Sequence, residues 1–127
     1  MTVLKCKMCG GDLEFDPGKL ARDKIPDIIR QSGKDCTCSI LSDEDYLKFL
    51  DEKLNEELAE YQESKSMEEL ADLLEVMRAV AVARGSSPEE IENIRREKAE
   101  KRGGFEKKIL LEEVTEGCVS DGSNETD

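Results

Sequence analysis

The sequence contains no tryptophan and no histidine, and aromatic residues make up only 4% of its 127 residues. The core of a β-sandwich or β-barrel usually contains more large aromatic side chains than this sequence can supply. We therefore expect an all-α fold packed with Leu, Ile, Val and Ala. The length suits one compact domain with a small appendage.

Long apolar runs are missing as well. None approaches the roughly 18 residues that a membrane-spanning helix requires, and the first residues, Met1–Lys5, lack the apolar region of a secretion signal. We therefore expect a cytoplasmic protein with no membrane contact. Positive charge is also scarce, because 19 Lys and Arg against 31 Asp and Glu give a net charge of −12. This balance argues against general binding of nucleic acid.

The five cysteines predict thiolate chemistry. Without histidines, and in a reducing compartment, they favour metal ligands over disulfides. Cys6 and Cys9 form a CxxC followed by two glycines, which resembles the knuckle of a zinc ribbon. Zinc takes four ligands, and Cys36 and Cys38 are the remaining nearby thiols, although their CxC spacing is unusual. Free thiols or a redox-active CxxC are the alternatives.

Two acidic pairs with helical spacing occupy the middle of the chain. Glu57 and Glu60 precede a polar break at 64–66, and Glu69 and Asp72 follow it. Residues three apart are neighbours on a helix, so an antiparallel hairpin would bring these carboxylates together. They would repel one another without a cation between them, which favours a Mg²⁺ site.

An ordinary explanation of the same acids exists. Ser66 and Glu69 fit a capping box, in which the Glu69 carboxylate would reach back to the Ser66 amide. Acidic residues are also common in the first turn of a helix, where they offset the helix dipole. Spacing alone leaves both interpretations open.

Local signals predict the helices around these pairs. A long helix starts near Ser42, a second runs from Ser66 to a stop at Gly85, and a third starts at Ser87–Pro88 and closes at Gly103–Gly104. A shorter helix is expected between 19 and 34. The apolar stripe of the first long helix consists of Leu47, Leu50, Leu54, Leu58 and Tyr61. Glu57 lies at the border of this stripe, and Glu56 points more nearly to solvent.

Basic residues gather in two places, at Lys19–Lys24 and between Arg95 and Lys108. For the first group, spacing alone favours a solvated surface. The second group fits partners of a helix C-terminus or, in so acidic a chain, a phosphate clamp. The segment Phe105–Leu111 fits a short strand or a helix, and we favour an extended strand.

Four stretches of the chain together resemble the MazG-like all-α nucleoside triphosphate pyrophosphohydrolases, a superfamily that includes phosphoribosyl-ATP pyrophosphohydrolase. Their order along the chain is part of the resemblance. One is EExxE at 56–60 followed by ExxD at 69–72. The others look like a small-protein branch of the superfamily and are Lys19–Pro26 (KLARDKIP), Glu68–Val76 (EELADLLEV) and Lys101–Phe105 (KRGGF). The resemblance implies a domain over about 19–114. A zinc-knuckle-like segment (1–18) would precede it, and a disordered acidic tail (115–127) would follow.

The resemblance implies hydrolysis of a nucleoside triphosphate between the α and β phosphates, giving the monophosphate and pyrophosphate. The implied role is house-cleaning of the nucleotide pool, that is, the removal of damaged or surplus nucleotides. Mg²⁺ or Mn²⁺ would be held by Glu57, Glu60, Glu69 and Asp72. Glu56 and Glu57 would be catalytic, with Glu56 accepting the proton of the attacking water. Phosphate oxygens would be bound by Arg22, Lys24, Lys98, Lys101 and Arg102.

The resemblance also implies a homodimer or higher homo-oligomer, and the broad apolar face around Leu70–Val80 suits a helix pair completed by a second subunit. Two other functions compete with general nucleotide hydrolysis. One is a phosphoribosyl-ATP pyrophosphohydrolase of histidine synthesis. The other is a non-catalytic helical interaction module with a zinc knuckle, in which the acids only solvate two helices.

Overall fold

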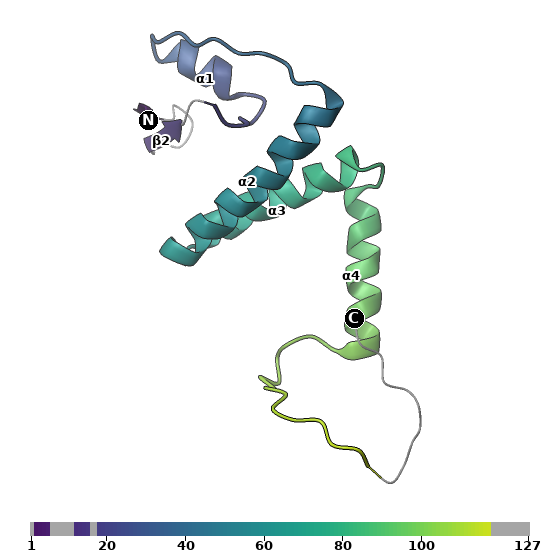
Figure 1. Cartoon of the computed structure of the whole chain (residues 1–127). Coiled ribbons are helices and arrows are strands. Elements are labelled where there is room, and N and C mark those ends of the chain that lie inside the picture. Colours follow the sequence, from purple (N-terminus) through teal and green to yellow (C-terminus); the bar gives the residue numbers. More distant parts are fainter. Residues whose placement is uncertain (1, 6–11, 16–17, 118–127) are drawn as a thin grey trace. The chain divides into compact units, whose positions relative to one another are not determined.

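The computed structural model describes residues 2–5, 12–15 and 18–117. In chain order these contain strands β1 (Thr2–Lys5) and β2 (Asp12–Phe15) and helices α1 (Ile25–Gln31), α2 (Asp43–Ser64), α3 (Met67–Ala83) and α4 (Pro88–Arg102) (Figure 1). The chain divides into two compact units, Met1–Asn93 and Ile94–Asp127, and the boundary falls within α4. Among the described helices, none is both long and apolar enough to cross a membrane.

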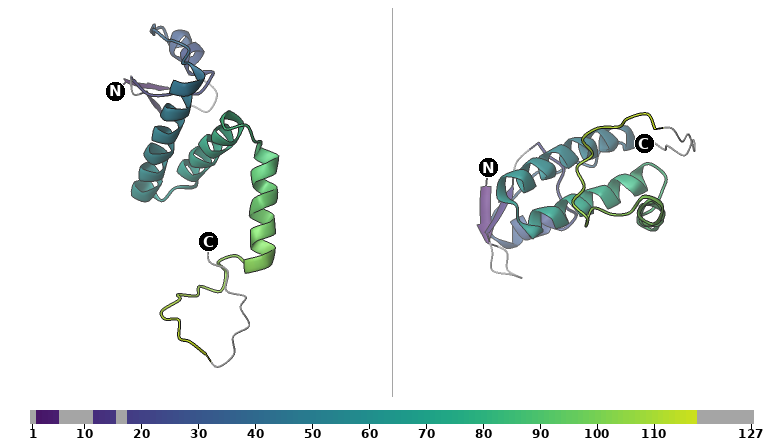
Figure 2. Two further views of the ribbon diagram at one scale, coloured as in Figure 1. Left: turned by 45° about the vertical axis from the view of Figure 1, so that its right-hand side comes forward. Right: turned by 90° about the horizontal axis from the view of Figure 1, so that it is seen from below.

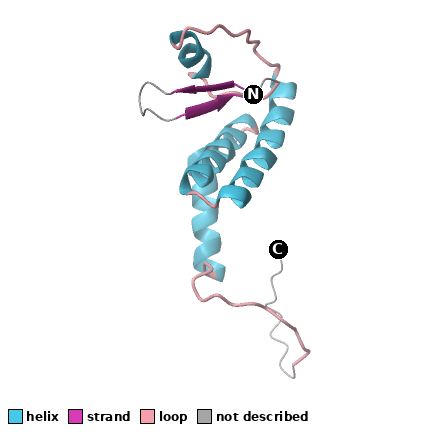
Figure 3. Cartoon of the chain, turned by 90° about the vertical axis from the view of Figure 1, so that its left-hand side faces the viewer, coloured by secondary structure: helices cyan, strands magenta, loops and turns pink. Residues whose placement is uncertain are grey.

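Helices are the regular structure of residues 18–117, as the all-α prediction requires. The N-terminal segment adds a two-stranded antiparallel sheet that the sequence analysis did not predict (Figure 3). In its register Thr2 pairs with Phe15 and Lys5 with Asp12. Cys6 and Cys9, two of the predicted zinc ligands, lie outside the described residues.

The predicted helix starts are confirmed, and each has a local cause. Ser42 caps α2 by accepting a hydrogen bond from the Asp45 N–H at 3.2 Å, and Ser66 caps α3 by accepting one from the Glu69 N–H at 3.3 Å. Such caps satisfy amide donors that have no partner within the helix. The last helix begins at Pro88, whose fixed φ suits the first helical position.

A two-residue turn joins α2 to α3. Lys65 adopts a left-handed conformation with φ of 58°, and its N–H donates to the Tyr61 carbonyl at 2.7 Å, which ends α2. Ser66 then starts α3 directly. The short connection folds the two helices into an antiparallel hairpin, and they lie side by side in Figures 1 and 2.

The hairpin buries few residues. Leu50 and Ala81 are 2% and 6% exposed, and the third buried residue is an acid, Glu57, at 6%. Leu58, which was predicted to belong to the apolar stripe, is instead 42% exposed. Glu57 takes the inward position because it lies seven residues after Leu50, two full turns along the same face of α2.

Apolar side chains also remain exposed along α3. Met67, Leu70, Leu74 and Met77, spaced by three or four residues, are exposed by 67%, 37%, 53% and 40%. This spacing places them on one face of the helix. The hairpin thus leaves much of the apolar surface of α3 uncovered.

The strand expected near Phe105–Leu111 is not formed. Residues 103–117 contain no helix or strand, and a turn follows α4, in which the Lys108 N–H donates to the Phe105 carbonyl at 3.2 Å. A strand needs a neighbouring strand to pair its backbone groups. Within the described part of its own unit, this segment has no such neighbour.

Removing the cap of α3 tests whether local signals determine the hairpin. We expect Ser66→Ala to lower the free energy of unfolding by about 1 kcal/mol, because the Glu69 N–H loses its acceptor. Ser66→Thr keeps a capping hydroxyl and is the control. Urea unfolding followed by circular dichroism measures both, and equal stability of Ser66→Ala and the parent would contradict this role of the cap.

Candidate metal centre

The hairpin brings acidic side chains from α2 and α3 to one place. Glu57, Glu69 and Asp72 each offer a carboxylate oxygen within 4.8 Å of the others, and Glu56, Glu57 and Glu60 form a second group by the same measure. Glu57 belongs to both groups. The five residues are called the acidic cluster below.

Glu57 is the buried centre of this cluster. Its side chain is 8% exposed, and its nearest cation is Lys53, whose Nζ lies 3.6 Å from Glu57 Oε1. The other carboxylate oxygen, Oε2, is buried without a hydrogen-bond partner among the described residues. A buried oxygen with no partner is costly, so such a group calls for an explanation such as an ion.

Burial raises the pKa of Glu57 from its ordinary 4.5 to about 7. The neighbouring carboxylates of Glu60 and Asp72 add to this rise by repulsion, whereas the Lys53 ammonium opposes it. Partial desolvation, followed by repulsion from Glu60 and Asp72, also raises the pKa of Glu69. Carboxylates this close oppose one another's ionisation, and a divalent cation among them would reverse that effect.

The capping-box explanation of Glu69 receives no support from the hydrogen bonds. Ser66 Oγ accepts from the Glu69 N–H, but the Ser66 N–H donates to Ser64 Oγ at 3.2 Å. The Ser66 amide is therefore satisfied without the Glu69 carboxylate. That carboxylate lies instead beside Glu57 and Asp72.

The spacing of the oxygens suits a hard divalent cation. Mg²⁺ binds oxygen at roughly 2.1 Å and Ca²⁺ at up to about 2.6 Å, so oxygens on opposite sides of one ion lie about 4 to 5 Å apart. Oxygens that share one ion cannot lie much further apart than this, and those of Glu57, Glu69 and Asp72 all lie within 4.8 Å of one another. These residues have the donor chemistry for such an ion and lie close enough together to share one.

Glu56 does not point to solvent as predicted. Its side chain is 21% exposed and lies between two ammonium groups, with Lys19 Nζ 3.3 Å from Oε2 and Lys53 Nζ 3.3 Å from Oε1. The sequence analysis did not include Lys19 or Lys53 in the site. Lys53 could have been found, because it precedes Glu56 and Glu57 by three and four residues on α2.

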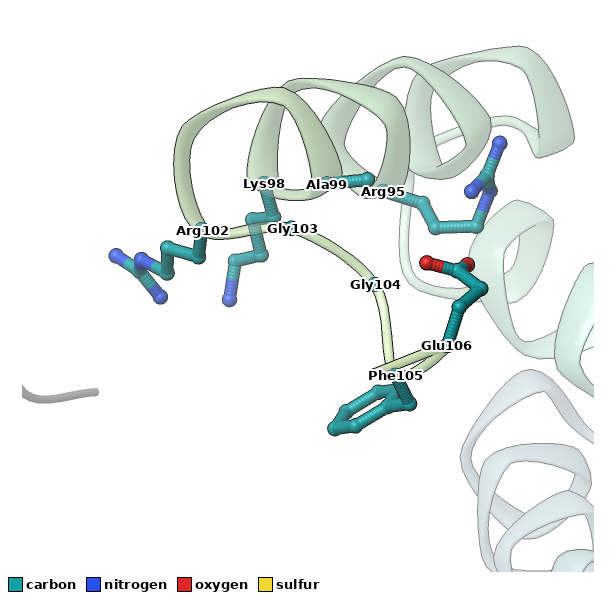
Figure 4. A pocket seen from close by; sticks show the side chains of 8 residues that line it. All are labelled: Arg95, Lys98, Ala99, Arg102, Gly103, Gly104, Phe105 and Glu106. Carbon is teal, nitrogen blue, oxygen red and sulfur yellow. The ribbon is translucent and has the colours of Figure 1, made fainter. Parts of the chain in front are cut away.

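One predicted phosphate ligand does reach the acidic cluster. Arg22, from the segment before α1, donates from Nη2 to Asp72 Oδ1 at 2.7 Å. Lys24 occupies the N-cap position of α1 without a side-chain hydrogen bond to the helix, and it is exposed. Lys98, Lys101 and Arg102 belong to α4 in the second unit, where Lys98 and Arg102 line a pocket (Figure 4).

Two of the predicted zinc ligands face one another. The Sγ atoms of Cys36 and Cys38 are 3.8 Å apart, and both thiols are free. Two thiolates on one tetrahedral zinc, each about 2.3 Å from the metal, are separated by about 3.8 Å. Desolvation and the adjacent Cys38 raise the pKa of Cys36, so zinc would have to displace its proton.

Comparison with other proteins adds one relative. The chain is 50% identical over 42 residues to an uncharacterised protein of Mycolicibacterium smegmatis, a match that covers 33% of this chain and 43% of that protein. No family model matches the chain. No solved structure matches it either.

Proposed function

We propose that this chain is a Mg²⁺- or Mn²⁺-dependent nucleoside triphosphate pyrophosphohydrolase. One observation carries the proposal: a carboxylate oxygen of Glu57, buried and without a partner, lies where acids from two helices converge within 4.8 Å. An acidic pair on one exposed helix face would show neither feature. The resemblance of the EExxE and ExxD stretches to the MazG-like hydrolases supplies the reaction class.

In this proposal Glu57, Glu60, Glu69 and Asp72 hold the cation. When bound, the ion neutralises phosphate charge and makes a water molecule more acidic. Glu56 accepts the proton of the attacking water, with Lys19 and Lys53 fixing the orientation of its carboxylate. The water oxygen forms a bond to the α-phosphorus, and the bond from that phosphorus to the bridging oxygen breaks. A nucleoside monophosphate and pyrophosphate leave.

Arg22 has a second task in this reaction. Its guanidinium orients Asp72 through the 2.7 Å hydrogen bond, and its side chain is 59% exposed. The exposed donors of such a group bind phosphate oxygens strongly. Arg22 thereby links the acidic cluster to a triphosphate.

Two further properties belong to the proposal. A structural Zn²⁺ joins Cys36 and Cys38 to the two N-terminal thiols, as the 3.8 Å separation of the sulfur atoms favours. A second copy of the chain covers the exposed apolar face of α3, because a monomer seldom leaves so much contiguous apolar surface in water.

The test is a panel of ribo- and deoxyribonucleoside triphosphates, with phosphoribosyl-ATP included, assayed for pyrophosphate. We expect release from at least one compound with Mg²⁺ or Mn²⁺, and none in EDTA. The same sample is analysed for bound zinc and for mass by light scattering. The non-catalytic module would be favoured instead if no member of the panel released pyrophosphate and if divalent ions did not change the thermal stability of the protein.

A further inference from the structure

Two thiols lie in contact in the segment between α1 and α2. Cys36 Sγ and Cys38 Sγ are 3.8 Å apart, and both residues belong to the first unit of the chain. Residues 34–42 contain no helix or strand, as the connection between α1 and α2 in Figure 1 shows. Regular backbone pairing therefore does not fix the separation of the two side chains. We call Cys36 and Cys38 the thiol pair.

The two thiols differ in how they are held. Cys36 is half-buried, and its Sγ donates to the Pro26 carbonyl at 3.9 Å, at the start of α1. Its N–H donates to Asp35 Oδ1 at 2.8 Å, and its carbonyl accepts from Arg30 Nη2 at 3.3 Å. Cys38 is exposed. One thiol is thus anchored against α1, and the other is open to reagents in solution.

An exposed thiol with a second thiol beside it is the arrangement of a redox-active pair. The oxidant is a low-molecular-weight disulfide such as oxidised glutathione. Cys38 Sγ attacks one sulfur of that disulfide as the thiolate, and the disulfide breaks and releases one glutathione. Cys36 Sγ then attacks Cys38 Sγ, and the second glutathione leaves. The thiol pair loses two electrons and two protons, and the two glutathione thiols that depart have gained them.

The disulfide formed in this way is expected to open easily. Its sulfur atoms have to approach from contact to about 2.05 Å with a defined dihedral angle, and a single residue, Thr37, separates the two cysteines. Cys38 also leaves the bond accessible to solvent. Strained or exposed disulfides are reduced more readily than buried structural ones. An excess of reduced glutathione therefore reopens the pair.

We propose that Cys36 and Cys38 form a reversible disulfide by exchange with small disulfides, with Cys38 as the attacking thiol and Cys36 as the resolving thiol. The inference concerns the metal-free chain and does not rest on the proposed function. Zinc and the disulfide exclude one another at the thiol pair, because sulfur atoms bonded to each other supply no thiolate ligand. A bound zinc ion would protect the pair from oxidation.

A single tryptic peptide reports on the thiol pair. Cleavage after Lys34 and Lys48 yields residues 35–48, which contain Cys36 and Cys38 and no other cysteine. The reduced full chain is incubated in EDTA with oxidised glutathione, the remaining thiols are alkylated, and the mass of the peptide is measured. We expect this peptide to have lost two hydrogen atoms and to carry neither glutathione nor an alkyl group. Excess reduced glutathione, added before alkylation, should restore two alkylated thiols.

Single variants assign the two roles. Cys36→Ser lacks the resolving thiol, so the mixed disulfide of Cys38 with glutathione should accumulate at least about tenfold over the parent. Cys38→Ser keeps only the half-buried thiol, which should react with oxidised glutathione about tenfold more slowly than Cys38 does in Cys36→Ser. A faster reaction of Cys38→Ser would overturn these roles. The control, Cys118→Ser, removes a thiol outside the pair and should oxidise at residues 35–48 as the parent does.

A parental peptide that carries two glutathione molecules, or two alkyl groups at every glutathione ratio, would overturn the inference. A cross-link from this peptide to another cysteine would overturn it as well. A chain with both Cys6→Ser and Cys9→Ser lacks two of the proposed zinc ligands and should still close the disulfide. Pyrophosphate release by a chain that forms no such bond would refute only the inference. Closure of the bond in a chain that hydrolyses no triphosphate would refute only the proposed function.

Discussion

Replacing Glu57 by glutamine is expected to lower pyrophosphate release at least about a hundredfold. Glu57 is common to both groups of the acidic cluster, so its loss removes a ligand and a negative charge from each. The amide has nearly the same size, and it fills the same buried position without a charge. A loss of about a hundredfold is what the removal of one strong electrostatic contact to a reacting group usually causes.

The matched control is Glu52→Gln, which changes the net charge equally on the same helix at an exposed position outside the acidic cluster. It should keep the parental rate. Metal binding supplies a second readout, because an ion that binds only the folded state adds about 2.7 kcal/mol at a hundred times its dissociation constant. Glu57→Gln should lose most of this gain. If Glu57→Gln turned over substrate at the parental rate, the acidic cluster would have no part in the reaction.

The stability of the metal-free protein is expected to fall as pH rises from about 4.5 to about 7. The pKa of Glu57 is raised in the folded state from its ordinary 4.5 to about 7, so over this range the folded chain holds a proton that the unfolded chain releases. The stabilisation is complete below the ordinary pKa and is lost as pH passes the raised one. A shift of this size corresponds to at most about 3 to 4 kcal/mol, and the raised pKa of Glu69 acts in the same direction.

Urea unfolding in EDTA at several pH values measures this effect, and the comparison with Glu57→Gln isolates it. The variant cannot titrate at this position, so we expect a shallower slope and a more stable protein than the parent at pH 8. Mg²⁺ should reverse the slope in the parent, because the ion competes with protons for the carboxylates. Identical slopes for the parent and Glu57→Gln in EDTA would show that burial of Glu57 does not control the pH dependence.

Most of the helical frame could be predicted from the sequence because its causes are local. The caps at Ser42 and Ser66 and the stop at Gly85 each act within a few residues of themselves. The same is true of the spacing within the acidic pairs, since residues three apart on a helix are always neighbours. Because the turn at 65–66 is only two residues long, α3 folds back along α2.

Prediction was wrong where a result depended on distant or missing neighbours. The segment after Gly103 has enough apolar residues for a strand, but it finds no strand to pair with in the described part of its unit. Leu58 was expected to be covered, yet Glu57 occupies the inward position. Periodicity alone could not rank these adjacent positions, because both lie near the edge of the same stripe.

The sequence by itself determined where the helices begin and end and which acids share a helix face, because backbone capping and helical spacing are short-range effects. Only the tertiary structure decided that Glu57 is buried without a partner for one oxygen, that Glu56 lies between Lys19 and Lys53, and that Arg22 reaches Asp72 across 50 residues of chain. Burial and ion pairing depend on which surfaces meet after the chain has folded back on itself. The spacing of residues along the chain does not contain that information.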